Sequence, residues 1–381
     1  MPFSFLGRRF APLALLGPLV LLSACKDEPE KPPASNTCFQ TLVLNEDISL
    51  CEALPSDYQP RSNLASWGTY ACTVNENPNQ YQAINETDIS TITRVAAFDK
   101  MAALLWKNPQ PPSSEDFTQA REMYSTDEGL DSRVQRREDV HFPVLPDCKR
   151  CNQVDNTVQQ QHADRCAGPM KIAPIINAAF REGMAGNSPL AQARKIEAAL
   201  LWFHHLSALS EVQTCANEPK NCDSAWSYYT GGTSRDTLKG LAAYVHAASP
   251  ETHHLAYDAA LAVRCWRDVD KATPAANTDL QYRALKQYDK ALSRGMALIL
   301  REKVVEWEGA HEAEKFAEMQ AFVQTLFGLM ENSLMRFAKT GALPHKEGLV
   351  HELKALIESA SPNSTSIGKM NELLDSLFPC S

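Results

Sequence analysis

Apolar residues at helical spacing are the feature that most constrains the fold of this chain. From Asp88 onward they recur at intervals of three and four residues, and helix-capping signals bound the segments. Alternating strand patterns between hairpin turns are nearly absent. The sequence therefore predicts an all-α helical bundle over residues 88–381, preceded by a loop-rich, cysteine-containing segment over residues 38–87.

Helix boundaries are predicted from Ser, Thr and Asp at N-cap positions, from Pro at the first helical position, and from Gly after the last one. The N-terminal signals are Thr87 or Asp88, Ser113 in a capping box with Asp116, Ser188 before Pro189, and Ser249 before Pro250. Gly341 is expected to end a helix. The expected helices cover residues 88–108, 113–124, 174–183, 189–213, 236–248, 250–269, 279–307, 311–339, 346–359 and 367–377.

The first 25 residues carry an export pattern. Arg8 and Arg9 precede an apolar run over residues 10–22, which is too short for a spanning helix, and Leu-Ser-Ala then leads to Cys25. This pattern resembles the lipobox of bacterial lipoproteins, which implies cleavage before Cys25 and a covalent lipid on that cysteine. Lys26 in the next position favours the outer membrane. The alternative is an uncleaved anchor helix with an incidental cysteine.

This pattern divides the N-terminal part of the chain. Residues 1–24 are the predicted signal peptide, and residues 25–37, charged and without periodicity, are a predicted flexible tether. Cleavage removes two arginines and no acid, so the formal net charge changes from −9 to −11. We expect an exported, lipid-anchored protein of the cell envelope, on its periplasmic or surface face, and the acidic charge argues against a nucleic-acid partner.

Ten of the eleven cysteines follow Cys25, and in an exported chain they predict five disulfides. They are Cys38, Cys51, Cys72, Cys148, Cys151, Cys166, Cys215, Cys222, Cys265 and Cys380. The best local pair is Cys215 with Cys222, which bracket a polar loop. An alternative that the spacing leaves open is a zinc site formed by Cys148, Cys151, His162 and Cys166.

A polar stripe runs along the predicted helix over residues 189–213, which is apolar in nearly every direction. Glu197, His204 and Glu211 recur every seven residues, so at about 100° per residue they lie within about 40° of one another. Buried carboxylates need cations, donors or a metal as partners. Seven residues rise about 10.5 Å, so a metal would also need ligands from a facing helix. Ion pairs with arginines are the alternative.

The helix opened by Ser249 offers facing ligands, because Glu251, His254 and Asp258 share one of its faces. Glu-x-x-His is the spacing used by di-iron helical bundles. The same spacing also occurs at Glu138/His141 and Glu308/His311. The alternative for Glu251 is a solvated first turn, where its charge complements the helix dipole.

Residues 222–232 combine Asp223 and Tyr229, both hard oxygen ligands, with aromatic residues and paired glycines that can line a pocket. The alternative is a packed helix that ends at a glycine. Downstream, Arg264 can bind an anion or neutralise a buried acid. The charged run over residues 133–139 predicts a solvated face.

Several short stretches resemble the Fe-assimilating, low-iron-inducible periplasmic proteins of green algae and their bacterial relatives. They are the aromatic-Gly stretch 225–231, the stretches 255–258 and 264–266, and residues 116–124. The resemblance covers about residues 90–310. It implies a secreted helical protein that captures iron outside the cytoplasm, without known catalysis. The His204-His205 and His253-His254 pairs do not map onto that family.

The first hypothesis is a lipid-anchored protein that binds iron or another transition metal in the bundle, for uptake or storage. The expected ligands are Glu197, His204, Glu211, Glu251, His254, Asp258, Asp223 and Tyr229, with Arg264 balancing their charge. The expected partners are the membrane, through the lipid on Cys25, and a metal transporter or another envelope protein. The alternative is a non-enzymatic scaffold or interaction lipoprotein with a purely structural polar core. No nucleophile elbow, phosphate loop, zincin helix or kinase motif set supports an enzyme.

Overall fold

The computed structural model of this chain describes residues 57–58, 72–85, 89–126, 129–267, 278–340, 346–359 and 362–378. All of them belong to one compact unit, Cys38–Ser381. The predicted signal peptide, tether and lipid-bearing Cys25 lie outside the described residues, as does much of the predicted loop-rich segment. Within the described ranges the fold has no strand, and its one β-bridge joins Thr73 to Tyr81. The prediction of an all-α fold is therefore confirmed.

The helices follow one another along the chain, with the longest connection among the described residues between α3 and α4. In order they are α1 (Thr91–Leu105), α2 (Ser114–Thr126), α3 (Leu130–Val134), α4 (Asn156–Gln161), the π-helical turn η4 (Gly168–Ile172), α5 (Ala173–Met184), α6 (Pro189–Thr214), α7 (Lys220–Thr230), α8 (Gly240–Ala248), α9 (Pro250–Cys265), α10 (Thr278–Glu308), α11 (Ala313–Thr340), α12 (Glu347–Ile357) and α13 (Ser364–Leu377).

Of the predicted caps, those at Ser113 and Ser249 form, and the one at Ser188 does not. The Asp116 amide donates to Ser113 Oγ at 3.2 Å, and the Ser113 amide donates to Asp116 Oδ2 at 2.8 Å, which confirms the capping box. Ser249 accepts a hydrogen bond from the Thr252 amide at 3.1 Å, as predicted. The cap predicted at Ser188 is wrong, because its left-handed backbone (φ of 47°) replaces the extended conformation of an N-cap.

Two helices begin at least three residues later than predicted. The residue before α1 is Ser90, so the predicted caps at residues 87 and 88 do not start this helix. The start of α8 is Gly240 instead of residue 236, because a turn holds the preceding residues: the Thr237 amide donates to the Ser234 carbonyl at 3.1 Å. The Thr233 hydroxyl also donates to the Thr237 carbonyl at 2.5 Å, and local side-chain bonding of this kind competes with helix formation.

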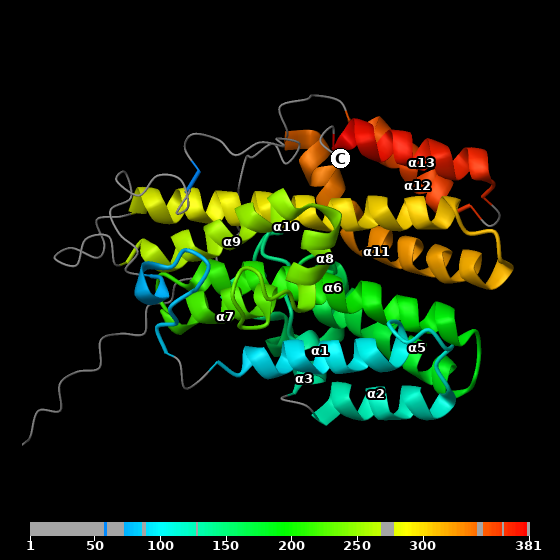
Figure 1. The fold of residues 1–381 in the computed structure, drawn as a ribbon, viewed down its shortest axis with the longest axis horizontal. Helices are drawn as coiled ribbons and strands as arrows, with labels where there is room; N and C mark the ends of the chain where they lie inside the picture. Colours follow the sequence, from blue (N-terminus) through cyan, green and yellow to red (C-terminus); the bar gives the residue numbers. More distant parts are fainter. Residues whose placement is uncertain are drawn as a thin grey trace, which may run out of the picture. The chain divides into compact units, whose positions relative to one another are not determined.

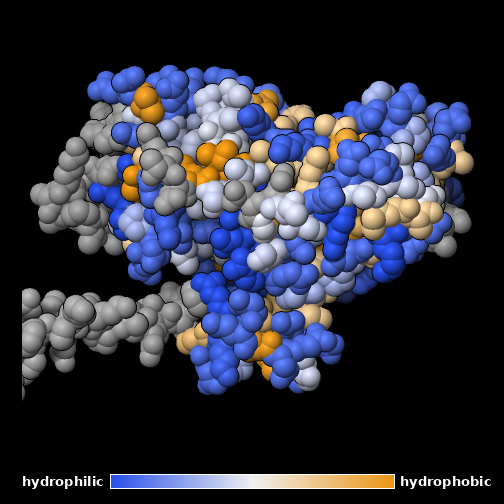
Figure 2. Space-filling view, turned by 90° about the horizontal axis from the view of Figure 1, so that it is seen from below, coloured by the Kyte–Doolittle hydropathy of each residue, from blue (hydrophilic) through white to orange (hydrophobic). Residues whose placement is uncertain are grey.

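Helix α6 is the centre of the bundle. It packs against α5, α7 and α11, while α10 packs against α9, α11 and α13 (Figure 1). Every residue from 196 to 209 on α6 is buried, as expected for a helix that is apolar on all sides. The polar residues of α6 must therefore find their partners inside the protein. The face shown in Figure 2 is mostly hydrophilic, with separate small apolar areas.

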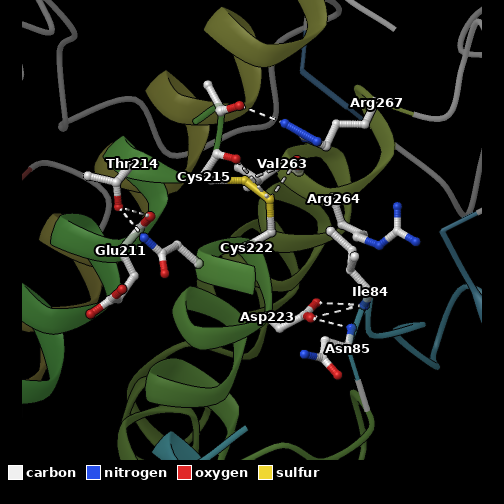
Figure 3. The surroundings of a disulfide bond; sticks show 12 residues. Ile84, Asn85, Glu211, Thr214, Cys215, Cys222, Asp223, Val263, Arg264 and Arg267 are labelled. Atoms are coloured by element: carbon white, nitrogen blue, oxygen red, sulfur yellow. Dashed lines mark hydrogen bonds between the residues drawn. A yellow bond between two sulfur atoms is a disulfide. The ribbon is translucent and has the colours of Figure 1, made fainter. Parts of the chain in front are cut away.

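Among the described residues, disulfides join Cys72 to Cys265, Cys151 to Cys166, and Cys215 to Cys222. The local pair predicted between α6 and α7 is confirmed (Figure 3). Cys148 is also disulfide-bonded, so the zinc alternative at Cys148, Cys151, His162 and Cys166 is wrong. Cys38, Cys51 and Cys380 lie outside the described residues. In the part of the chain that the structure describes, none of the helices has the length and apolar content needed to span a bilayer.

Candidate functional site

Glu197, the first member of the polar stripe on α6, has a network of its own. Its Oε2 accepts a hydrogen bond from Arg194 Nη1 at 2.6 Å, and its Oε1 accepts one from the Tyr244 hydroxyl at 2.7 Å. Arg194 also reaches Glu318 on α11, at 2.6 Å. Burial, together with the Glu197 carboxylate, raises the pKa of Tyr244 well above its ordinary value. Glu197 therefore forms an ion pair with an arginine, which is the alternative to a metal ligand that the sequence left open.

His204, the second member, is completely buried in an aromatic environment. Its ring centroid lies 5.1 Å from Phe98, 5.2 Å from Phe203 and 6.0 Å from Tyr228. Neither ring nitrogen has a hydrogen-bond partner in the described part of the chain. Burial, with a smaller effect of the Arg137 charge, lowers the pKa of His204 to about 3. The same guanidinium opposes a metal cation at this imidazole.

Glu211, the third member, lies near the end of α6, where its Oε1 is 3.6 Å from Arg137 Nη2. The Arg137 guanidinium also lies 5.6 Å from the ring of Phe203 and 5.5 Å from that of Tyr228. Cation–π contacts of this kind stabilise a partly desolvated guanidinium. Glu211 is thus the acidic neighbour of a buried cation.

The solvated face predicted over residues 133–139 is wrong for its second half. Arg137, Glu138 and Asp139 are all buried. Glu138 Oε2 accepts from Arg165 Nε at 3.0 Å and lies 2.9 Å from Arg165 Nη2. This run of charges turns inward because each acid finds a cation in the folded protein.

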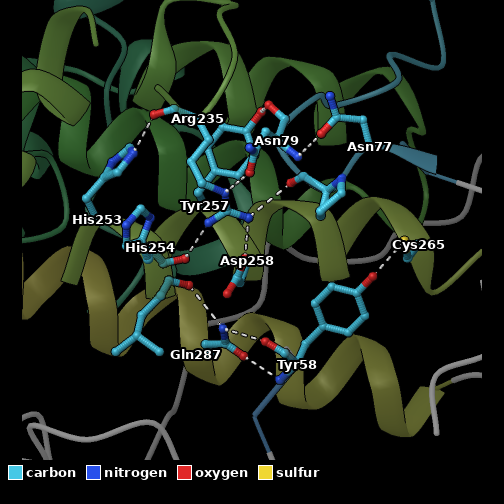
Figure 4. A network of polar contacts seen from close by, with 12 residues as sticks. Tyr58, Asn77, Asn79, Arg235, His253, His254, Tyr257, Asp258, Cys265 and Gln287 are labelled. Carbon is cyan, nitrogen blue, oxygen red and sulfur yellow. Dashed lines mark hydrogen bonds and ion pairs between the residues drawn. The ribbon is translucent and has the colours of Figure 1, made fainter. Parts of the chain in front are cut away.

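The predicted set on α9 separates into an exposed and a buried part. Glu251 is exposed in the first turn, as its solvated alternative predicts. Asp258 is buried and accepts a hydrogen bond from Arg235 (Figure 4). Arg235 also donates to the His254 carbonyl at 3.2 Å and lies 4.4 Å from the ring of Tyr257. The Asp258 charge is therefore balanced by a guanidinium from the α7–α8 connection.

Asp223 on α7 binds the N-terminal segment instead of a helix of the predicted site (Figure 3). Its carboxylate accepts hydrogen bonds of 2.9–3.0 Å from the Tyr81 hydroxyl and from the amides of Ile84 and Asn85. Arg264, the predicted charge-balancing residue, donates from Nε to the Gln82 carbonyl at 3.0 Å. Asp223 and Arg264 thus both fasten residues 81–85 to the bundle.

Tyr229 lies close to His253, with its hydroxyl 2.9 Å from Nδ1. The other ring nitrogen of His253 is 2.9 Å from the Arg235 carbonyl, so His253 donates through Nε2 and accepts from the tyrosine. Burial raises the pKa of Tyr229 well above its ordinary value and lowers the pKa of His253 to about 4. Helix α7 ends at Gly231 (φ of 69°), which confirms the alternative of a packed helix with a glycine end.

The structure does not bring the eight predicted ligands together at one centre. Each buried acid already has its own donor, from α6, α8, the N-terminal segment or the α7–α8 connection. Among the described residues, no three His, Cys, Asp or Glu side chains are arranged to hold a metal ion. Metal binding by these eight residues stays a prediction.

Sequence reasoning missed a buried triad centred on His141. Nδ1 of His141 is 2.9 Å from Asp139 Oδ1, and Nε2 is 2.8 Å from Asp289 Oδ1 on α10. Although burial opposes the charge, the two carboxylates raise the pKa of His141 to about 9. The His141 charge in turn lowers the pKa of Asp289 to about 2. Positively charged His141 and the two carboxylates form a charged cluster inside the bundle.

The sequence held one signal for this triad, the short Asp-x-His spacing of Asp139 and His141. The second carboxylate has no such signal, because Asp289 is 148 residues away in the sequence. The Glu138/His141 pair that matches the di-iron spacing is split, with Glu138 bound to Arg165 and His141 to the two aspartates.

Comparisons with known proteins assign this chain to no family. No protein-family model, no curated protein and no solved structure matches the chain.

Proposed function

We propose that this chain is an exported, lipid-anchored protein of the cell envelope that works as a helical scaffold or interaction protein with a structural polar core. One observation carries the proposal: the buried acids of the predicted site are paired with donors inside the protein. Asp258 binds Arg235 and Glu197 binds Arg194. Removing one partner of such a pair leaves a buried charge unbalanced, so these networks stabilise a single packing of the helices.

The anchoring part of the proposal rests on the export pattern that ends at Cys25. A lipid there attaches the chain to a membrane without a spanning helix. The test is fractionation of cells that express the full chain or its Cys25→Ser variant. The wild type is expected in the membrane fraction with the mass of a lipidated protein, and the variant is expected to lose both properties. A variant that stays membrane-bound would contradict a lipid anchor.

Binding of iron or another transition metal is the second candidate. The sequence resemblance supports it, and so does a group of imidazoles where α8 meets α9. The ring centroids of His246 and His254 lie 6.5 Å apart, and both residues are half-buried. Imidazole is a common ligand for iron, copper and zinc. A metal transporter would then be the partner.

Metal analysis separates the two candidates. The exported full chain is purified with its disulfides formed and without chelator, loaded anaerobically with ferrous iron or aerobically with ferric iron, and measured by elemental analysis. The scaffold proposal expects less than stoichiometric metal. Stoichiometric metal that falls in His254→Ala would favour the imidazole group, and a loss in His204→Ala or Glu211→Ala would favour the stripe on α6. Both results would contradict the scaffold proposal.

A further inference from the structure

Arg133 and Arg137 lie near the end of α3. Their two positive charges have one nearby carboxylate, that of Glu211, among the described ion pairs. Arg133 is half-buried, and its side chain forms no hydrogen bond or ion pair within the described part of the chain. Arg137 is 7% exposed, and its Nε is buried without a hydrogen-bond partner there. The acidic neighbour is Glu211, 3.6 Å from Arg137 Nη2.

A third arginine and a tyrosine ring lie beside these two arginines. Arg94 of α1 is buried and donates to the Tyr228 hydroxyl at 3.5 Å. Tyr228 in turn lies 5.5 Å from the guanidinium of Arg137. Burial lowers the pKa of Arg133, and the charge of Arg94 adds to this effect, whereas Glu211 and Tyr228 oppose it. Cations are therefore gathered here against an electrostatic cost.

The backbone that carries Arg137 is held in place by η4. Gly168 donates its amide to the Arg137 carbonyl at 2.8 Å. A Cβ at Gly168 would lie 2.0 Å from the Val134 carbonyl oxygen and 2.7 Å from that of Arg137, so only glycine allows this approach. The segment between Arg133 and Arg137 is thus fixed against the bundle, and such a rigid support is typical of a binding site.

We propose that Arg133 and Arg137 bind an oxyanionic group, a phosphate or a carboxylate, at the junction of α3, α6 and α7. A guanidinium presents a planar fork of donors that matches such oxygens, and the unpartnered Nε of Arg137 supplies one of them. Arg133 and Glu211 are both partly exposed, so the group can be reached from solvent. The Glu211 carboxylate already neutralises part of the Arg137 charge, so it competes with the anion for this arginine. This proposal is independent of the scaffold and metal proposals.

The first test is calorimetric titration of the full chain with inorganic phosphate, and separately with acetate, at an ionic strength held constant with chloride. Saturable binding of at least one anion is expected. Arg133→Gln should weaken it by about tenfold or more, because a charge-assisted hydrogen bond is lost. Glu211→Gln should strengthen it, because a competing carboxylate is removed. Binding of neither anion would overturn the proposal.

Arg136→Gln is the matched control. Arg136 is exposed, belongs to the same segment, and binds only the carbonyl and hydroxyl of Ser132 in its own turn, both at 2.9 Å. Its loss should change the affinity by less than about threefold, since it acts only through screened charge. Equal losses in Arg133→Gln and Arg136→Gln would show unspecific attraction and overturn the proposal. Arg133→Lys keeps the charge without the fork, so an affinity between those of wild type and Arg133→Gln is expected.

A second titration identifies the source of the group. The Cys25→Ser chain, which lacks the lipid attachment site, is mixed with vesicles of phosphatidylglycerol or phosphatidylcholine. Binding to phosphatidylglycerol alone that is lost in Arg133→Gln would assign the site to a lipid headgroup. Binding of the soluble anion without vesicle binding would assign it to a free ligand.

Discussion

His141 and His204 are both completely buried in the same bundle, yet their protonation is opposite. His141 lies between Asp139 and Asp289, and the two carboxylates raise its pKa to about 9. His204 lies among aromatic rings near Arg137, and burial with that charge lowers its pKa to about 3. Burial disfavours the charged form in both regions, so the sign of the neighbouring charge decides which form persists.

This difference shows why residue type and spacing alone did not identify a site. His204 belongs to the stripe on α6 but has no acidic hydrogen-bond partner, whereas His141 does not pair with Glu138 of its Glu-x-x-His pattern and is bound by two aspartates. The partners of a buried imidazole, and not its place in a helix, determine its chemistry.

Removing one carboxylate from the triad should have the largest effect. Asp289→Asn leaves protonated His141 with a single acidic partner, so we expect a loss of about 3–5 kcal/mol in the free energy of unfolding, measured by urea denaturation near neutral pH. Asp375→Asn is the matched control. Asp375 pairs with Arg301 but its side chain is 45% exposed, so its loss should cost less than about 1 kcal/mol. If the two substitutions lowered the free energy of unfolding equally, the buried triad would stabilise the protein no more than an exposed ion pair does.

Raising the pH should weaken the His141 region next most strongly. The pKa of His141 is about 9 in the folded protein and 6.5 ordinarily, so its contribution is complete below pH 6.5 and is lost as the pH rises to 9. The expected loss is about 3 kcal/mol, and it should be smaller in Asp289→Asn. Urea denaturation at several pH values across this window measures it. A wild-type curve that matches that of Asp289→Asn would contradict a charged His141.

Lowering the pH should weaken the His204 region. The pKa of His204 is about 3 in the folded protein, below its ordinary 6.5, so its neutral form stabilises the fold above pH 6.5 and this contribution is lost as the pH falls toward 3. His204→Leu removes that dependence. Relative to wild type, the variant should gain about 2 kcal/mol between about pH 7 and about pH 5. An unchanged difference between the two proteins would show that His204 is not held neutral.

The smallest effect is expected at a histidine outside the buried regions. His351 on α12 is exposed, so His351→Gln should change the free energy of unfolding by less than about 0.5 kcal/mol near neutral pH. A cost similar to that of Asp289→Asn would mean that burial is not what separates these histidines.

Much of the fold was predictable because its signals are local. The Ser113–Asp116 box and the Ser249 cap join residues three positions apart, and the Cys215–Cys222 disulfide spans seven. The predicted helices after residue 88 correspond to helices of the structure, with shifted ends. The short α3 and α4 were not predicted, because five or six residues carry too little periodicity.

The polar sites were not predictable to the same extent, because their partners are far apart in the sequence. Cys72 and Cys265 are 193 residues apart, and the buried pair Arg235–Asp258 is completed by the carbonyl of Pro78. The stripe on α6 correctly indicated buried polar residues, but it carried no information on which cation, donor or ring would face each one.

By itself, the sequence determined that the described chain is helical and where its best caps lie, since helical spacing and capping depend on residues within one or two turns. Only the tertiary structure decided that His141 is charged, that His204 is neutral and that Arg137 pairs with Glu211. Those properties depend on desolvation and on charges a few ångströms away, which are set by how distant helices pack.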